Sequence, residues 1–255
     1  MTDNKRVLIT GGTGKVGHSL VEGFACAGWQ VVLTSRNKER AERLAAKFKK
    51  STGSSIYGIV AEFDGLDGTS RFVENLKRND LLPTCLINNA RNQENLALDE
   101  SGQPLFNSWL QEFYLSVVVA YELSMKFSYL QGCRLNSVIN VASMYGVVAP
   151  TLHLYENPKQ DSPVHYGVCK AALIHLTKEL SVRLASKCIR VNAISYGGIE
   201  GRTGKDFVDR YANLCPQGRM LNDTDVAGPA LFLASEAASG VTGHNLIADG
   251  GWSVW

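Results

Sequence analysis

The sequence predicts an α/β protein in which a doubly wound parallel sheet carries helices on both faces. Three observations support this fold class: short runs rich in Val and Ile, longer segments with helical period between those runs, and Gly, Asn, Asp or Ser at the junctions. Continuous apolar runs are typical of parallel strands that are buried on both faces. Because strands and helices alternate, right-handed crossovers are expected to place the strands in one parallel sheet.

Six apolar runs are expected to form the strands. The segments between them have helical length, as from Leu173 to Leu184, where leucines recur every three or four residues. The stretch at about 147–163 contains three prolines and is expected to be an inserted arm of a single domain spanning residues 1–255. The arm is expected to face the substrate, with a plain surface excursion as the alternative. The expected strands are Arg6–Thr10, Gln30–Ser35, Ile56–Glu62, Thr84–Asn88, Ser137–Ala142 and Arg190–Ile194.

Composition and charge exclude several classes of protein. Of the 255 residues, 45% are hydrophobic and 20% are charged, which are globular values and not those of a disordered or collagenous chain. With 26 Lys and Arg against 24 Asp and Glu, and no charged block, nucleic acid is not an expected partner. Neither a signal peptide nor an apolar segment of about 20 residues is recognisable, so no membrane association is expected. The six scattered cysteines form no C-x-x-C pair and are expected to be reduced thiols of a cytoplasmic protein.

A glycine-rich turn directly follows the first expected strand, and a helix is expected from His18 to Ala27. The glycine spacing permits a tight turn and a close approach of backbone to a pyrophosphate, while the helix N-terminus supplies N–H groups and a positive dipole. In this position the turn predicts a dinucleotide-binding site of the Rossmann fold, with a purely structural turn as the alternative. The residues expected to bind the cofactor here are Gly11, Thr13, Gly14, Lys15, Val16 and Gly17.

The end of the second strand predicts which dinucleotide binds. An acidic residue there favours the free 2′-hydroxyl of NAD, whereas an arginine favours the 2′-phosphate of NADP. The residues at this point are Ser35 and Arg36, with no acid beside them, so NADP(H) is expected to be preferred over NAD(H). Lys15 is expected to add a second positive charge. The alternative for Arg36 is a solvated residue at the start of a helix.

Further motifs, over essentially the whole chain, resemble those of the short-chain dehydrogenase/reductase family. The resemblance implies a nicotinamide-dependent oxidoreductase and assigns an expected role to each matching position. These positions are Asp64 and Gly65 for an adenine contact, Asn89, Ala90 and Arg91 beside the cofactor, Ser143, Tyr166 and Lys170 for catalysis, Ser116 for a proton relay, Gly197 and Ile199 over the nicotinamide, and Asp249-Gly250-Gly251 as a C-terminal signature.

The catalytic Tyr-x-x-x-Lys pattern of the family occurs twice, from Tyr155 to Lys159 and from Tyr166 to Lys170. Tyr155 stands at about the usual family distance from the catalytic serine, so it is a real competitor. Pro158 blocks the interior of any helix joining Tyr155 to Lys159, whereas Tyr166 and Lys170 are expected to open a continuous helix, one turn apart. We therefore predict that Tyr166 and Lys170 form the catalytic pair and that the arm before them is an insertion.

The predicted chemistry follows from what hydride transfer needs. A carbonyl that receives hydride develops negative charge on oxygen and must be protonated. The resemblance implies that Tyr166 is the acid or base, that Lys170 favours its phenolate and holds the nicotinamide ribose, and that Ser143 donates to the substrate oxygen. A free phenol has a pKa of about 10, so it needs a nearby positive charge to act as a base at neutral pH. The nicotinamide carries the hydride, and no metal is expected.

Four departures from the family pattern lie in and around the expected site. Lys15 stands in the glycine turn where the family usually has Gly. Arg91 replaces a frequent glycine and is expected to narrow the pocket or to contact an anionic substrate. Ser116 stands where the family usually has Asn, so the relay is expected to run through water. Tyr196 replaces a frequent proline and is expected to loosen the loop over the nicotinamide. These departures keep a non-catalytic dinucleotide-binding sensor or scaffold as an alternative of another class.

The sequence therefore predicts an NADP(H)-dependent oxidoreductase that transfers hydride between nicotinamide and a carbonyl or secondary alcohol. Segments 143–150 and 196–200 resemble bacterial reductases associated with surface sugars and nonulosonates. The polar arm, which includes Glu156 and Asn157, suits a hydroxylated substrate, because each buried hydroxyl needs a partner. A 3-oxoacyl-type or general ketone reductase is the alternative.

The resemblance also implies a homodimer or homotetramer. The expected contacts are the helices at 105–130 and 163–187 and the C-terminal segment. Burial of Trp252 and Trp255 would stabilise more than exposure would, either against a neighbouring subunit or within the same chain.

Overall fold

The computed structural model describes residues 5–65, 67–201 and 203–255. Within these residues, seven strands form one parallel sheet in the order β3-β2-β1-β4-β5-β6-β7. The chain changes direction across the sheet at β1, which has β2 on one side and β4 on the other, and ligands of such sheets bind outside the carboxyl ends at this switch point. The strands are β1 (Arg6–Ile9), β2 (Gln30–Ser35), β3 (Ile56–Val60), β4 (Cys85–Asn88), β5 (Ser137–Val141), β6 (Arg190–Tyr196) and β7 (Asn245–Ala248).

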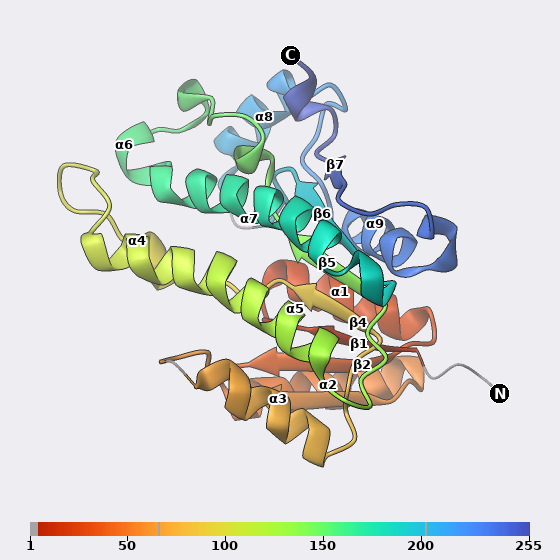
Figure 1. Ribbon diagram of the computed structural model, residues 1–255. Helices are drawn as coiled ribbons and strands as arrows, with labels where there is room; N and C mark the ends of the chain where they lie inside the picture. Colours follow the sequence, from red (N-terminus) through yellow and green to blue (C-terminus); the bar gives the residue numbers. More distant parts are fainter. Residues whose placement is uncertain (1–4, 66, 202) are drawn as a thin grey trace.

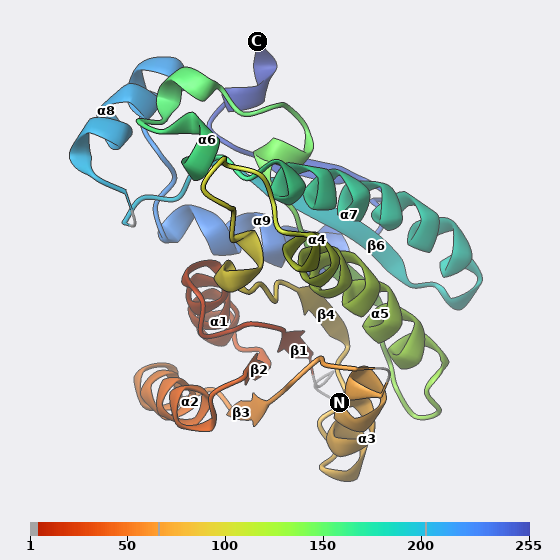
Figure 2. The same cartoon turned by 90° about the vertical axis from the view of Figure 1, so that its left-hand side faces the viewer.

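Helices cover both faces of the sheet (Figures 1 and 2). One face carries α1 (Lys15–Cys26), α2 (Lys38–Thr52) and α9 (Thr224–Ala234), and the other carries α3 (Gly68–Arg78), α5 (Val119–Tyr129) and α7 (Val164–Arg183). Helix α4 (Phe106–Phe113) continues into α5 through a π-helical turn, η2 (Tyr114–Val118). The short helices are η1 (Gln93–Leu96), η3 (Met144–Gly146), η4 (Leu152–Leu154), α6 (Pro158–Asp161), η5 (Ala185–Lys187), α8 (Lys205–Leu214), η6 (Glu236–Ala238) and η7 (Trp252–Val254).

The strands contribute side chains to two hydrophobic layers, one on each face of the sheet, because successive side chains of a strand point to opposite faces. In β1, Val7 and Ile9 belong to the layer under α1 and α2, whereas Leu8 belongs to the layer under α3, α5 and α7. The largest buried side chains of the two layers include Phe24 on α1 and Phe127 on α5, both almost fully buried. Burial of one such side chain stabilises the fold by about 1.5–3 kcal/mol.

The predicted fold class is confirmed, and all six expected strands are present with ends within two residues of the prediction. The seventh strand, β7, was not predicted, because its residues at the sheet edge are half-exposed and do not form a continuous buried run. Helix α1 begins at Lys15, and the expected start at His18 is wrong. Gly14 has extended backbone and caps this helix, so Gly17 lies inside it.

The expected arm at 147–163 contains two short helices, η4 and α6. Tyr155 follows the end of η4, and Pro158 begins α6, so Tyr155 and Lys159 do not share a helix, as predicted. The arm is anchored to α8, because Arg210 Nε donates to the carbonyl oxygen of Leu154 at 2.9 Å.

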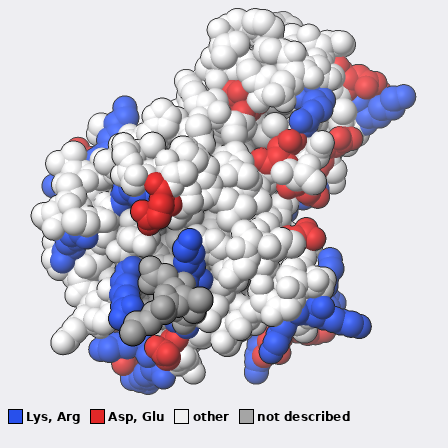
Figure 3. All heavy atoms as spheres, turned by 90° about the vertical axis from the view of Figure 1, so that its right-hand side faces the viewer, with Lys and Arg blue, Asp and Glu red and all other residues white. Residues whose placement is uncertain are grey.

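On the face shown in Figure 3, Lys and Arg side chains lie next to Asp and Glu, and uncharged surface separates these mixed groups. This arrangement matches the formal net charge of +2. In the described part of the chain, no helix is long and apolar enough to cross a membrane.

Candidate active site

The turn between β1 and α1 has the close packing that only glycine allows. Gly11 has φ +64°, and a Cβ on it would lie 2.9 Å from Ala90 Cα. A Cβ on Gly17 would collide with the carbonyl oxygen of Gly11. No side chain caps the start of α1, so the N–H groups of its first turn are free to bind an anionic ligand.

This turn opens into a cavity of about 1140 Å³ at the switch point of the sheet. Its size and its mixed polar and apolar lining suit a dinucleotide together with a small substrate. The cavity is lined by all of the predicted site residues except Gly65 and Ser116. The predicted residues that line it are Gly11, Thr13, Gly14, Lys15, Val16, Gly17, Ser35, Arg36, Asp64, Asn89, Ala90, Arg91, Ser143, Tyr166, Lys170, Gly197 and Ile199.

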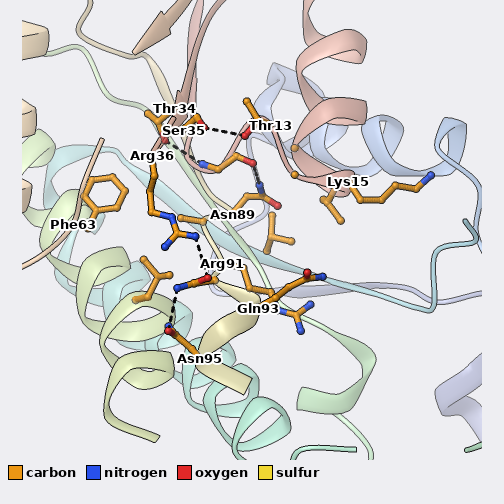
Figure 4. A pocket seen from close by; sticks show the side chains of 18 of the residues that line it. Thr13, Lys15, Thr34, Ser35, Arg36, Phe63, Asn89, Arg91, Gln93 and Asn95 are labelled. Carbon is orange, nitrogen blue, oxygen red and sulfur yellow. Dashed lines mark hydrogen bonds between the residues drawn. The ribbon is translucent and has the colours of Figure 1, made fainter. Parts of the chain in front are cut away.

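The end of the cavity beside β2 carries the residues predicted to select the dinucleotide (Figure 4). The hydroxyl of Thr13 donates to Ser35 Oγ at 3.1 Å. The Arg36 guanidinium donates to Asn92 Oδ1 at 3.1 Å and lies 3.8 Å from Glu94 Oε2. Both charged side chains are exposed, so this ion pair is weak and leaves Arg36 available to a ligand anion.

Lys15 does not add positive charge beside Arg36, contrary to the prediction. Its side chain points away from Arg36 (Figure 4), and its Nζ lies 2.9 Å from a carboxylate oxygen of Asp223. The physical reason is helix packing. Lys15 is the first residue of α1, Asp223 directly precedes α9, and these two helices pack against each other.

Gly65 is not among the residues that line the cavity. It has φ +63°, and its carbonyl oxygen accepts from the Tyr114 hydroxyl at 2.9 Å. Its neighbour Asp64 does line the cavity and lies 3.4 Å from an Arg71 nitrogen.

The segment after β4 joins the two halves of the site. The Asn89 side chain donates to the carbonyl oxygens of Thr10 and Gly11 at 2.9 and 3.2 Å, which holds the glycine turn against β4. The backbone N–H of Ala90 donates to the Thr10 hydroxyl at 3.0 Å. The next residue, Arg91, reaches across the cavity, and its guanidinium carbon lies 4.5 Å from the centre of the Tyr166 ring.

Ser143, Tyr166 and Lys170 lie together at the other end of the cavity. Ser143 caps the start of η3, where its hydroxyl accepts from the Tyr145 backbone N–H at 3.2 Å. Tyr166 lies in the first turn of α7, and Lys170 follows one turn later, with its Nζ 5.8 Å from the centre of the Tyr166 ring. The Lys170 ammonium is buried and donates to the Val141 carbonyl oxygen at 2.9 Å.

The competing tyrosine, Tyr155, does not line this cavity. Its hydroxyl lies 2.6 Å from the hydroxyl of Tyr145, in a separate apolar cluster with Tyr211 and Trp252. Burial raises the pKa of both Tyr145 and Tyr155, which favours the neutral phenols. The Tyr155 hydroxyl thus pairs with another phenol, whereas Tyr166 has the Lys170 ammonium 5.8 Å from its ring centre.

Ser116 lies in the π-helical turn η2, is buried and does not line the cavity. Its hydroxyl donates to Glu112 Oε1 at 2.8 Å. The prediction placed Ser116 in the relay but did not single out Glu112. One signal in the sequence could have identified Glu112. It is an acidic residue four positions before Ser116, in a helical segment whose other buried residues are apolar or small.

Tyr196 anchors the end of β6, whereas it was predicted to loosen the loop that follows. It is buried, pairs with Ala248 of β7, and its hydroxyl donates to the Val226 carbonyl oxygen at 2.6 Å. The bond ties β6 to α9 directly before Gly197 and Ile199, which both line the cavity. Burial raises the pKa of the Tyr196 hydroxyl, so it stays a donor at neutral pH.

Several cavity residues were not predicted. The polar run at 92–95 directly follows Arg91 and could have been recognised as part of the site, because it lies near the carboxyl end of a central strand. In the described residues, no group of three His, Cys, Asp or Glu side chains could hold a metal ion. The unpredicted lining residues include Thr34, Asn37, Arg40, Phe63, Asn92, Gln93, Glu94 and Asn95.

A glycine turn at the switch point, joined through one cavity to a serine, a tyrosine and a lysine, defines a nicotinamide-dependent oxidoreductase. The model of a family described as enoyl-(acyl carrier protein) reductase, adh_short_C2, matches residues 14–253. The chain belongs to the short-chain dehydrogenase/reductase family. As a member of this family it transfers hydride between a nicotinamide dinucleotide and a carbonyl or CH–OH group.

Curated relatives and solved structures are similar over nearly the whole chain. Post-translational flagellin modification protein A of Campylobacter coli is 26% identical over 258 residues and covers 100% of both chains. A 3-oxoacyl-(acyl-carrier-protein) reductase of Chlamydia trachomatis is 28% identical over 256 residues and covers 97% of both. A short-chain dehydrogenase of Leptospira borgpetersenii, solved with bound NAD+, has a TM-score of 0.81 at 27% identity and covers 98% of this chain and 93% of that one.

Proposed function

We propose that the protein is an NADP(H)-dependent reductase of a polar carbonyl compound, with NAD(H) as the weaker cofactor. Arg36 is the observation that carries the cofactor preference. Its exposed guanidinium follows β2 directly and lines the cavity, and among the described residues it is held by Asn92 and by an exposed contact to Glu94. A planar guanidinium binds phosphate through two hydrogen bonds, whereas a ribose hydroxyl would need an acid at this point.

The residues of the cavity fit the cofactor. The uncapped first turn of α1 and the packing around Gly11 and Gly17 suit a pyrophosphate held by backbone N–H groups. When bound, the nicotinamide would supply the hydride. Lys170 uses one ammonium proton on Val141, which leaves two donors for a ribose.

The catalytic roles proposed for the chain follow from these positions. Tyr166 gives its hydroxyl proton to the carbonyl oxygen of the substrate as negative charge develops there. Ser143 donates a hydrogen bond to the same oxygen and orients the carbonyl. Both side chains line the same cavity.

Arg91 supports a polar, anionic substrate. Its exposed guanidinium lies over Tyr166, and it forms no ion pair with any carboxylate of the described residues. A sugar-like substrate with a carboxylate or phosphate near its carbonyl would fit this cation. The resemblance of segments 143–150 and 196–200 to reductases associated with bacterial surface sugars supports this class of substrate. The similarity to a 3-oxoacyl reductase keeps that activity as a second candidate.

A homodimer or homotetramer is supported by apolar side chains left exposed on the helices expected to pair. They lie on α4, α5 and α7, and two of them, Leu110 and Phe113, line a shallow apolar depression. Trp252 stacks on Tyr211 of its own chain at 4.3 Å, whereas Trp255 is exposed. A cytoplasmic location is supported by six cysteines that are all unpaired. The exposed apolar residues of the three helices include Phe106, Leu110, Phe113, Tyr121, Tyr129, Val164, Val168 and Val182.

A fluorescence titration with NADPH and with NADH tests the cofactor preference. We expect tighter binding of NADPH, and we expect Arg36→Ala to weaken it about 10-fold while NADH binding stays unchanged, because a charged hydrogen bond contributes about 1.5–3 kcal/mol. Arg43→Ala is the matched control, since Arg43 is an exposed residue of α2 that does not line the cavity. Equal binding of both nucleotides by the wild type would refute the preference. Turnover is then screened with keto sugars, sugar keto acids and a 3-oxoacyl thioester.

A further inference from the structure

Arg36 is joined by two polar contacts to the segment that follows β4. Its guanidinium donates to Asn92 Oδ1 at 3.1 Å, and a guanidinium nitrogen lies 3.8 Å from Glu94 Oε2. Asn92 Nδ2 in turn donates to Glu94 Oε2 at 3.2 Å, which keeps the carboxylate beside the guanidinium. Figure 4 shows the Arg36 side chain extending toward the segment that carries Gln93. Three side chains from two distant parts of the sequence thus form one polar bridge.

This bridge spans the place where the pyrophosphate is proposed to bind. Arg36 directly follows β2, whereas Asn92 and Glu94 follow β4, and these two strands lie on either side of β1. The glycine turn leaves the carboxyl end of β1, so a contact between the segments after β2 and after β4 spans that end. All three residues of the bridge line the cavity. A dinucleotide bound on the turn therefore meets the bridge.

The position of Glu94 is fixed by contacts at both ends of the short helix η1. Asn92 caps η1 by accepting from the Glu94 backbone N–H at 3.3 Å. At the other end, the Asn95 carbonyl oxygen lies 2.8 Å from Nε2 of His165, which is fully buried. Because η1 is held at both ends, Glu94 is placed beside Arg36 by the fold and not by its own side chain alone.

Glu94 supplies an acid that the sequence around Arg36 lacks. In the described part of the chain, the acidic residues that line the cavity are Glu62, Asp64 and Glu94. Asp64 lies 3.4 Å from an Arg71 nitrogen, whereas Glu94 contacts Arg36. An acid at this end of a dinucleotide site favours the free 2′-hydroxyl of NAD(H) over the 2′-phosphate of NADP(H). The fold thus places an acid and a base with opposite preferences in contact.

We propose that Glu94 is a specificity-determining residue for the dinucleotide, because its carboxylate competes with the 2′-phosphate of NADP(H) for Arg36. The inference rests on the proposed function, since it needs this phosphate to lie at Arg36. A phosphate monoester carries a charge of about −1.5 to −2 at pH 7 and has to displace the Glu94 carboxylate from the guanidinium. NAD(H) has no phosphate there and leaves the contact intact. Glu94 therefore lowers the preference for NADP(H) and keeps NAD(H) acceptable.

Glu94→Gln tests the competition, because it removes the charge and keeps the shape of the side chain. We expect it to tighten NADPH binding about 3- to 5-fold in the fluorescence titration, the upper range for an exposed ion pair, and to change NADH binding by less than about 2-fold. The difference between Glu94→Gln and the wild type should shrink in about 0.5 M KCl, because salt screens exposed charges. Since 82% of the Glu94 side chain is exposed, the Tm should be unchanged.

Glu100→Gln is the matched control, since Glu100 is an exposed glutamate after η1 that does not line the cavity. It should leave both affinities unchanged. In the Arg36→Ala background the gain from Glu94→Gln should shrink, because no guanidinium is left to compete for. An undiminished gain there, or equal gains for NADPH and NADH in Glu94→Gln alone, would overturn the competition.

The variants also separate this inference from the proposed function. If Arg36→Ala leaves NADPH affinity unchanged, the 2′-phosphate does not lie at Arg36, and both the proposed cofactor preference and this inference are overturned. If Arg36→Ala weakens NADPH binding as expected but Glu94→Gln does not tighten it, this inference alone is overturned.

Discussion

The guanidinium of Arg91 lies over the aromatic ring of Tyr166, with its carbon 4.5 Å from the ring centre. A cation in this position contacts the ring face and keeps its N–H donors for a ligand. It lies beside the hydroxyl that we propose to protonate the substrate. Arg91 therefore links the choice of substrate to the proposed site of proton transfer.

Arg91→Gln is expected to lower kcat/KM about 10-fold for a keto acid substrate and to change it little for a neutral ketone. The reason is that a charged hydrogen bond to a carboxylate contributes about 1.5–3 kcal/mol, whereas a neutral ligand makes no such contact. Steady-state kinetics with a paired keto acid and keto sugar measure this selectivity. Arg183→Ala, an exposed arginine at the far end of α7, serves as the control. Equal losses for both substrates would show that Arg91 does not recognise charge.

Tyr166→Phe is expected to lower kcat about 100- to 10,000-fold, since a positioned acid contributes that factor to a proton transfer. The ring that contacts Arg91 remains, so cofactor binding should be unchanged. Tyr155→Phe is the comparison, because Tyr155 belongs to the second Tyr-x-x-x-Lys pattern but does not line the cavity. Retained turnover in Tyr166→Phe together with lost turnover in Tyr155→Phe would reverse the assignment.

Gly17→Ala is expected to abolish dinucleotide binding measurable by fluorescence, because its Cβ would collide with the carbonyl oxygen of Gly11 and force the turn open. Gly228→Ala provides a matched glycine, since a Cβ there meets no atom within 4 Å on α9. That substitution should leave dinucleotide binding unchanged, because Gly228 does not line the cavity. Normal binding by Gly17→Ala would mean that the turn does not hold the pyrophosphate.

Lys15→Ala is expected to leave the ratio of NADPH to NADH affinity unchanged, because Lys15 pairs with Asp223 and points away from Arg36. Any loss in affinity should be the same for both nucleotides. The two titrations, repeated on this variant and compared with Arg36→Ala, measure the ratio. A selective loss of NADPH affinity in Lys15→Ala would restore the role first predicted for it.

The free energy of unfolding is expected to fall as the pH decreases from 7.5 to 5.5, partly through His18. Burial, and then the charge of Lys47, lower the pKa of His18 below its ordinary value of 6.5. The unfolded chain therefore binds a proton at a higher pH than the folded chain does, so this contribution is complete above pH 6.5 and is lost as the pH falls through the folded pKa.

Urea unfolding at the two pH values measures this effect in the wild type and in His18→Asn. The variant should lose less stability than the wild type between pH 7.5 and pH 5.5. His175→Asn is the control, because His175 lies exposed on α7. Identical losses in the wild type and His18→Asn would exclude the contribution of His18.

Local spacing in the sequence determined the strands, the glycine turn and the choice between the two tyrosines. Pro158 excludes Tyr155 and Lys159 from one helix within five consecutive residues, and in the structure Tyr155 follows the end of η4 whereas Lys159 lies in α6. Likewise, Gly11 and Gly17 are recognisable because the turn that needs them is itself a local segment. Such features depend on neighbours in the chain, which the sequence shows directly.

Only the tertiary structure decided which distant group each side chain meets. Lys15 pairs with Asp223, 208 residues later, and Tyr196 bonds to Val226 on another element. Glu112 becomes a buried, half-satisfied carboxyl only because α7 packs over it. The energies that select these partners come from packing and burial across the whole fold, so residue type and spacing alone could not determine them.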